Sequence, residues 1–242
     1  MLPIKRFLAK ATRHRKRYGR PLVTLAYAQS LDGSIAARRG YPLTLSGRES
    51  LRLWHTLRAA HDAILVGIGT ILADNPRLNV RLIRGKNPQP VILDSNLRFP
   101  IGSKTLNNNK LPWIFTTESA DRERQRLLKT RGVTVIRVKT TSDCQVDLHE
   151  LLHQLAHRRV NSLLVEGGAR IITSFLNERL VDQFVITITP FIVGGLHGVE
   201  KLLCSHMIKK PAINYFPKIK NYQHHRLGQD LVVWGSVTWE DS

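Results

Sequence analysis

An acid and two glycines separate an apolar run from a helical pattern in LLVEGGARIITSFL, residues 163–176. Glu166 ends the run, Gly167 and Gly168 follow, and apolar residues then recur at helical spacing. A carboxylate is costly in a core unless it is paired or hydrogen-bonded, and glycine lets a ligand approach the backbone closely. A helix start offers unpaired N–H groups and partial positive charge, which suit a phosphate. The segment therefore indicates either a ligand-binding turn or a plain tight turn.

Three further strand-like runs end in residues that could contact a ligand. They end at Gly67-Ile68-Gly69-Thr70, at Asp94-Ser95 and at Ser30-Leu31-Asp32-Gly33. Ligands of open α/β sheets bind beyond the carboxyl ends of parallel strands, so four such ends favour a nucleotide-like ligand over turn chemistry alone. The G-x-G-x-x-G pattern lacks its third glycine and there is no Walker A motif. Any phosphates must therefore be held by another geometry.

The elements that carry these ends alternate between strand and helix, which predicts an α/β fold with a mixed, mostly parallel central sheet and helices on both faces. The last two strands lack a helix between them, so the far edge should be mixed or antiparallel. Residues 196–222 are expected to be irregular. One domain over 21–242, preceded by an extension over 1–20, is the predicted organisation. Helices are expected over 46–61, 120–132, 146–160 and from 169, and strands over 21–28, 90–95, 111–117, 133–138, 181–195 and 229–239.

Composition narrows the class of protein. The 242 residues, 42% of them hydrophobic, are enough for a sizeable core. No apolar run is long enough for a transmembrane helix. Two cysteines, Cys144 and Cys204, and ten scattered histidines show no metal-ligand spacing. We expect a cytoplasmic protein with reduced thiols, no bound metal and no membrane contact.

The net charge of +19 is large, and part of it lies at the front of the chain. Residues 1–20 hold eight Lys or Arg and no acid, while the other residues still hold 29 basic against 18 acidic side chains. The front could be a solvated tail, a nucleic-acid-binding segment or a targeting peptide. We favour the tail, because the aromatic residues expected of a single-strand binder are few.

Five segments in order match a known family: SLDG (30–33), LRAAHDAILVGIGTILADNPRLNVR (57–81), LDSNLRFP (93–100), LLVEGGARI (163–171) and DQFVITITPFIVGG (182–195). The chain resembles the reductase domain of the bifunctional riboflavin-biosynthesis deaminase/reductase and its stand-alone relatives. That resemblance implies a dihydrofolate-reductase-like fold, NADPH as cofactor and a homodimer. It also implies reduction of a ribosylaminopyrimidine 5′-phosphate to the ribitylamino compound. The zinc-dependent deaminase half is not matched.

The resemblance also implies roles for individual residues. Hydride would pass from NADPH to C1′ of the opened sugar imine, with Glu166 or Asp32 as the candidate general acid. Arg58 and Arg81 suit the substrate phosphate, because guanidinium groups match its geometry. Substrate contacts fall on Arg58, Leu78, Arg81 and Glu166, and cofactor contacts on Ala28, Thr44, Thr70, Asp74, Ser95, Gly167, Gly168, Ala169, Arg170 and Ile171.

Alternatives remain open at this point. Arg58 and Arg81 could be solvated surface residues, and Asp32 could be a turn residue. The family's usual serine and tryptophan are replaced by Pro42 and Thr44, which removes at least one polar contact. The chain could therefore be a related NADPH reductase with another substrate. The second function class, a nucleic-acid-binding protein that uses the +19 charge, predicts binding that added salt removes.

Overall fold

The computed structural model describes residues 4–200, 202, 213 and 216–239. Their contacts divide the chain into two compact units. Unit 1 contains Val23–Trp54 and Val165–Ser242, and unit 2 contains Leu2–Leu22 and His55–Leu164. The division falls within one helix, α3 (Arg48–Ala60).

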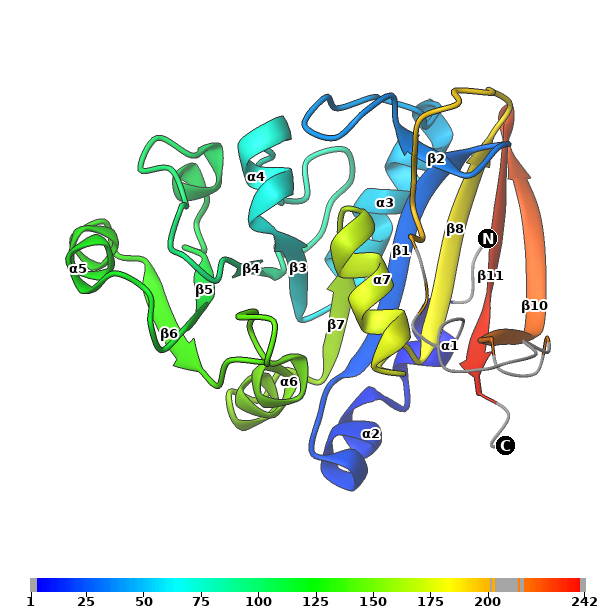
Figure 1. The fold of residues 1–242 in the computed structure, drawn as a ribbon. Helices are drawn as coiled ribbons and strands as arrows, with labels where there is room; N and C mark the ends of the chain where they lie inside the picture. Colours follow the sequence, from blue (N-terminus) through cyan, green and yellow to red (C-terminus); the bar gives the residue numbers. More distant parts are fainter. Residues whose placement is uncertain (1–3, 201, 203–212, 214–215, 240–242) are drawn as a thin grey trace. The chain divides into compact units, whose positions relative to one another are not determined.

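Unit 1 is built on four strands in the order β10, β11, β8, β1. β1 and β8 run parallel, whereas β11 is antiparallel to both β8 and β10. Figure 1 shows β10 beside β11, at the edge of this set. Leu25, Ile172, Phe175 and Val232 are completely buried. The elements are β1 (Leu22–Ser30), β2 (Ser34–Ala36), α7 (Ala169–Asn177), β8 (Gln183–Thr189), β9 (Leu196–His197), β10 (Lys218–Leu227) and β11 (Asp230–Thr238).

Unit 2 contains the strands β7, β3, β4, β5 and β6 in that order, and β3 to β6 are parallel. Its core includes Ile64, Ile92, Phe99 and Ile114, which are buried from solvent. The elements are α1 (Ile4–Leu8), α2 (Ala11–Tyr18), β3 (Ala63–Gly67), α4 (Ile68–Asp74), β4 (Gln89–Leu93), the 3-10 helix η1 (Lys104–Asn107), β5 (Trp113–Thr117), α5 (Arg122–Thr130), β6 (Thr134–Val138), α6 (Leu148–His157) and β7 (Ser162–Val165).

The mixed, mostly parallel sheet with helices confirms the predicted fold class. Side-chain caps fix several helix starts. Asp147 accepts the N–H of Glu150 at 2.9 Å at the start of α6, and Asp121 accepts the N–H of Glu123 at 2.7 Å at the start of α5. These acids stand where the sequence predicts helix starts.

Three expectations differ from the structure. Residues 4–18, expected as a solvated tail, form α1 and α2, and Arg15 of α2 donates to Asn161 Oδ1 at 2.9 Å and to the carbonyl oxygen of Ala156 at 3.3 Å. β10 occupies 218–227, partly inside the stretch expected to be irregular. β8 ends at Thr189, earlier than predicted. The units also do not divide at residue 20, so the predicted domain boundary stays a prediction.

Among the described residues, no helix is both long and apolar enough to cross a membrane.

Candidate active site

The turn from Glu166 to Gly168 joins β7 to α7, as the sequence predicts. Gly168 is the N-cap of α7, and its carbonyl oxygen accepts the N–H groups of Ile171 at 2.9 Å and Ile172 at 3.1 Å. No side chain caps this helix, and its first turn holds no acid. Arg170 is exposed in that turn. The helix dipole and a cation therefore both favour an anion at the start of α7.

Gly167 is required by the packing of the helix that follows it. A Cβ at this position would lie 2.5 Å from Cβ of Ile171 and 2.6 Å from its Cγ2. No real side chain fits at that separation, so Ile171 must shift if Gly167 is replaced. The glycine thus allows Ile171, in the first turn of α7, to pack against the turn that precedes the helix. Ala169, the first residue of α7, is buried.

Asp32 is surrounded by hydrogen-bond donors within unit 1. Its Oδ1 accepts from Ser30 Oγ and from Val193 N at 3.1 Å, and its Oδ2 accepts from Ser34 Oγ at 2.8 Å and Gly194 N at 2.7 Å. These bonds, the one from Ser30 foremost, hold the pKa of Asp32 well below its usual range. The carboxylate stays ionised at neutral pH. It is suited to hold the segment at Val193 and Gly194, and not to donate a proton.

The other two cofactor residues predicted in unit 1 lie on different elements. Ala28 is half-buried in β1 and pairs in register with Thr187 of β8. Thr44 is exposed in the irregular stretch between β2 and α3, as is Pro42.

In unit 2, the two predicted phosphate ligands meet at one residue. Arg58 donates from Nη1 to the carbonyl oxygen of Asn79 at 3.3 Å, and Arg81 donates from Nη1 to Oδ1 of Asn79 at 3.4 Å. The backbone N–H of Arg81 donates to Nδ1 of His55 at 3.1 Å. Two guanidinium groups are thus brought together from α3 and from the chain beyond α4. This arrangement can bind a phosphate.

His55, which accepts the backbone N–H of Arg81, is buried, with 2% of its surface exposed. Burial first, and then the charges of Arg58 and Arg81, lower its pKa to about 4. The ring is therefore neutral near pH 7. Because Nδ1 accepts the Arg81 N–H, its proton is on Nε2.

The remaining predicted residues of unit 2 are at strand and helix ends. Thr70 lies in α4 and Asp74 is its last residue, with an exposed side chain. Ser95 follows β4, and its carbonyl oxygen accepts bonds from the hydroxyl groups of Thr116 at 3.0 Å and Thr117 at 2.8 Å. The side chain of Leu78 belongs to the buried core. Leu78 could thus meet a ligand only through its backbone.

Sequence reasoning missed His55, Asn79 and Ser34, and it named Ser30 only as part of the turn that contains Asp32. His55 precedes Arg58 by one helical turn, so the helical pattern could have placed them on one face. The serines flank Asp32 at alternating positions, which is a weaker signal. The bond that Arg58 donates to Asn79 joins residues 21 positions apart and has no local signature.

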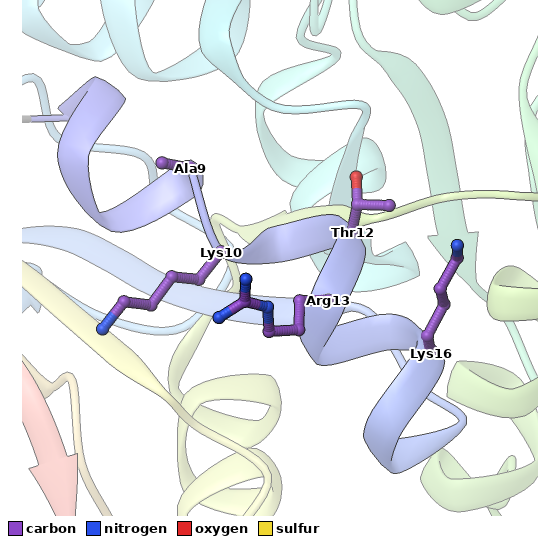
Figure 2. Close-up of a pocket in the computed structure, with 5 residues that line it drawn as sticks. All are labelled: Ala9, Lys10, Thr12, Arg13 and Lys16. Atoms are coloured by element: carbon purple, nitrogen blue, oxygen red, sulfur yellow. The ribbon is translucent and has the colours of Figure 1, made fainter.

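A second charged feature lies in unit 2, at the start of α2. Five residues line an open hollow there, and none of them is a predicted cofactor or substrate contact: Ala9, Lys10, Thr12, Arg13 and Lys16. Figure 2 shows Lys10 and Arg13 extending toward one side of the helix, with Lys16 pointing elsewhere.

Comparison with solved structures defines the class of fold. Dihydrofolate reductase from Enterococcus faecalis superimposes with a TM-score of 0.51 over 89% of this chain and 96% of that chain, at 13% identity. The RibD protein of Acinetobacter baumannii superimposes with a TM-score of 0.80 over 95% of this chain and 61% of that chain, at 24% identity. These likenesses show a dihydrofolate-reductase-like fold.

The chain belongs to the family described as the RibD C-terminal domain, whose model matches residues 21–233. A protein of Aquifex aeolicus named 2,5-diamino-6-ribosylamino-4(3H)-pyrimidinone 5′-phosphate reductase is 37% identical over 88% of this chain and 92% of its own length. The riboflavin biosynthesis protein RibD of the same organism is 34% identical over 89% of this chain, which spans 57% of that longer protein. The resemblance inferred from the sequence is confirmed.

Proposed function

We propose that the chain reduces a ribosylaminopyrimidine 5′-phosphate to the ribitylamino compound with NADPH, in riboflavin biosynthesis. The observation that carries this proposal is the pairing of Arg58 and Arg81 through Asn79. Two guanidinium groups held at Asn79, close to a neutral His55, form a cationic site of the kind that a 5′-phosphate needs. The name of the Aquifex aeolicus pyrimidinone 5′-phosphate reductase supports the substrate class, and the name of RibD supports the pathway.

The start of α7 fits a phosphate of the cofactor. It has no side-chain cap and no acid in its first turn, while Arg170 is exposed there. NADPH supplies a hydride when bound. The further cofactor contacts that we propose are Ala28, Thr44, Thr70, Asp74, Ser95 and the turn from Gly167 to Ile171.

Proton transfer is assigned to Glu166. The sugar ring of the substrate must open to an imine before C1′ accepts a hydride, and a positioned acid promotes that opening. Glu166 is half-buried at the end of β7. Asp32 is held ionised by its four donors, so we assign it a positioning role in place of the catalytic role first considered.

Cofactor binding is the first test. Purified protein is titrated with NADPH and NADH, and nicotinamide fluorescence is read. We expect NADPH to bind more tightly than NADH. We expect Gly168→Asp to lose binding, because its carboxylate would occupy the start of α7 and repel the cofactor phosphate. Failure of both nucleotides to bind would refute the proposal. Turnover is then measured with the deaminated and the undeaminated pyrimidine, because Pro42 and Thr44 replace two usual contacts of the family.

A second candidate function is binding of nucleic acid, favoured by one observation. The exposed residues Lys10, Arg13, Lys16 and Arg17 all lie on or next to α2. Labelled single- and double-stranded DNA and RNA are titrated at 50 and 200 mM salt. Affinity that falls steeply with salt and disappears when these four residues become Gln would support it. Unchanged binding in that variant would exclude α2 as the contact.

We also propose a cytoplasmic homodimer. The exposed apolar side chains of unit 1 include two adjacent ones, Phe191 at 53% and Ile192 at 82%, and apolar surface of this kind favours association. Light scattering after gel filtration should give twice the chain mass, and Ile192→Asp should lower it. A monomeric mass for the unmodified chain would contradict the dimer.

A further inference from the structure

Two histidines on α6 place their ring nitrogens face to face. His153 and His157 are one helical turn apart, and both side chains are exposed. Nε2 of His153 lies 3.1 Å from Nε2 of His157. The ring centroids are 4.3 Å apart and the planes meet at 81°. The two nitrogens can share one proton as a hydrogen bond, or they can face one metal ion.

The separation of these nitrogens fits a metal ion. Imidazole nitrogens bind Zn²⁺ at about 2.0–2.1 Å. Two such bonds at an angle between square-planar and tetrahedral values place the nitrogens about 2.9–3.4 Å apart. The observed 3.1 Å falls inside that range. The separation of the two nitrogens is therefore compatible with one ion bound to both, after a small rotation of the rings.

The helix end beside the pair favours a cation, whereas Arg158 and Arg159, which follow it in the chain, oppose one. His157 is the last residue of α6, and the carbonyl end of a helix carries partial negative charge. The side chain of Gln154, next to the pair in sequence, is engaged elsewhere: it donates to Glu150 Oε1 at 2.9 Å and accepts from Arg158 at 2.8 Å. The pair is therefore open to solvent and is not capped by Gln154.

We propose that His153 and His157 form a surface site for one divalent first-row transition ion. In the part of the chain that the structure describes, no group of three or more His, Cys, Asp or Glu could hold a metal, so water completes the coordination. Imidazole ligands suit Cu²⁺, Ni²⁺ and Zn²⁺, and affinity should be highest for Cu²⁺. The site bridges one turn of α6, so a bound ion should stabilise the folded chain. This proposal does not depend on the reductase activity.

The test uses the full chain without an affinity tag. Cu²⁺ and Ni²⁺ are titrated in by calorimetry, and Cu²⁺ is also followed by electron paramagnetic resonance. We expect one ion with two nitrogen ligands, and a higher Tm with Ni²⁺. His153→Gln and His157→Gln should each weaken binding at least about tenfold, because loss of even an outer-shell partner costs 10–100-fold. Both variants should fold, since Gln is a good helix former.

Matched controls separate this site from other histidines. His149→Gln lies one turn earlier on the same exposed face of α6 and should bind like the unmodified chain. The pair variant His224→Gln with His225→Gln on β10 should do the same. Mg²⁺, which prefers oxygen ligands, should leave Tm unchanged. The proposal fails if the unmodified chain binds neither Cu²⁺ nor Ni²⁺, if both α6 variants bind normally, or if His149→Gln loses binding equally.

Discussion

The backbone N–H of Arg81 donates to Nδ1 of His55 across 3.1 Å. A buried imidazole thereby fixes the main chain of a residue whose own side chain is exposed. Arg58 and Arg81 both donate to Asn79, so this neutral residue helps to position the two guanidinium groups. A site that binds an anion is pre-organised when its cations are held this way.

Arg58→Gln and Arg81→Gln should each raise KM for the phosphorylated pyrimidine. Loss of one charged hydrogen bond costs about 1.5–3 kcal/mol, which is roughly 10–100-fold in KM, with a smaller effect on kcat. Steady-state kinetics measure this. Arg84→Gln, exposed three residues beyond Arg81, is the control and should leave KM unchanged. An unaltered KM in both site variants would remove the phosphate assignment.

The free energy of unfolding should fall as the pH drops from about 6.5 to about 4. Burial lowers the pKa of both His55 and His61 to about 4. In that window the unfolded chain binds protons that the folded chain does not, so acid favours unfolding. Urea titrations between pH 4 and 7 measure the slope. His55→Gln should reduce it, because Gln keeps an acceptor for Arg81 and does not titrate; an equal slope would argue against a buried neutral His55.

Gly167→Ala should destabilise the protein by about 1–3 kcal/mol, the usual effect of overpacking. The added Cβ would lie 2.5 Å from Ile171. Gly69→Ala is the matched control, because nothing lies within 4 Å of a Cβ there. Gly69 is inside α4, so alanine should be neutral or stabilising by up to roughly 1 kcal/mol. Thermal unfolding of both variants compares them, and equal Tm values would contradict the close packing at Gly167.

Asp32→Asn should increase amide hydrogen exchange at Val193 and Gly194. Both N–H groups donate to the Asp32 carboxylate, and an amide presents only one acceptor oxygen. Hydrogen exchange read by NMR or mass spectrometry reports the two positions. Asp143→Asn, an exposed change, provides the baseline. If exchange at residues 193 and 194 is as slow in the Asp32 variant as in this control, the carboxylate does not hold that segment.

Arg15→Ala should lower stability by about 1 kcal/mol, whereas Arg13→Ala should not. Arg15 donates to Asn161 and to the carbonyl oxygen of Ala156, and Arg13 lines the open hollow. Chemical denaturation measures the difference. If Arg15→Ala and Arg13→Ala lower stability equally, the hydrogen bonds of Arg15 are not what makes α2 contribute to stability.

Much of the fold could be predicted because its signals are local. Asp147 and Asp121 mark the starts of α6 and α5, and short apolar runs mark the parallel strands. Glu166 followed by two glycines marks the turn into α7. Each of these residues sets the backbone conformation within a few positions of itself, so the sequence alone predicts these elements.

The features that could not be predicted depend on distant contacts or lack a pattern. β10 has almost no buried residue, so it shows no alternation of apolar and polar positions. α2 is basic nearly throughout and is held by Arg15, whose partner Asn161 is 146 positions away. The donors to Asp32 from Val193 and Gly194 come from equally far along the chain.

β10 has a consequence for how the protein behaves at high concentration. It is the outer strand of the four strands in unit 1. Its exposed residues include Lys218, Lys220, His224, His225 and Arg226. Its pairing with β11 is interrupted by a bulge between Lys220 and Gln223. Cations and bulges on an edge strand oppose strand addition from another chain. β10, which could not be predicted from the sequence, is thus protected against fibril-like aggregation. Replacing its lysines and arginine with apolar residues would favour such aggregation.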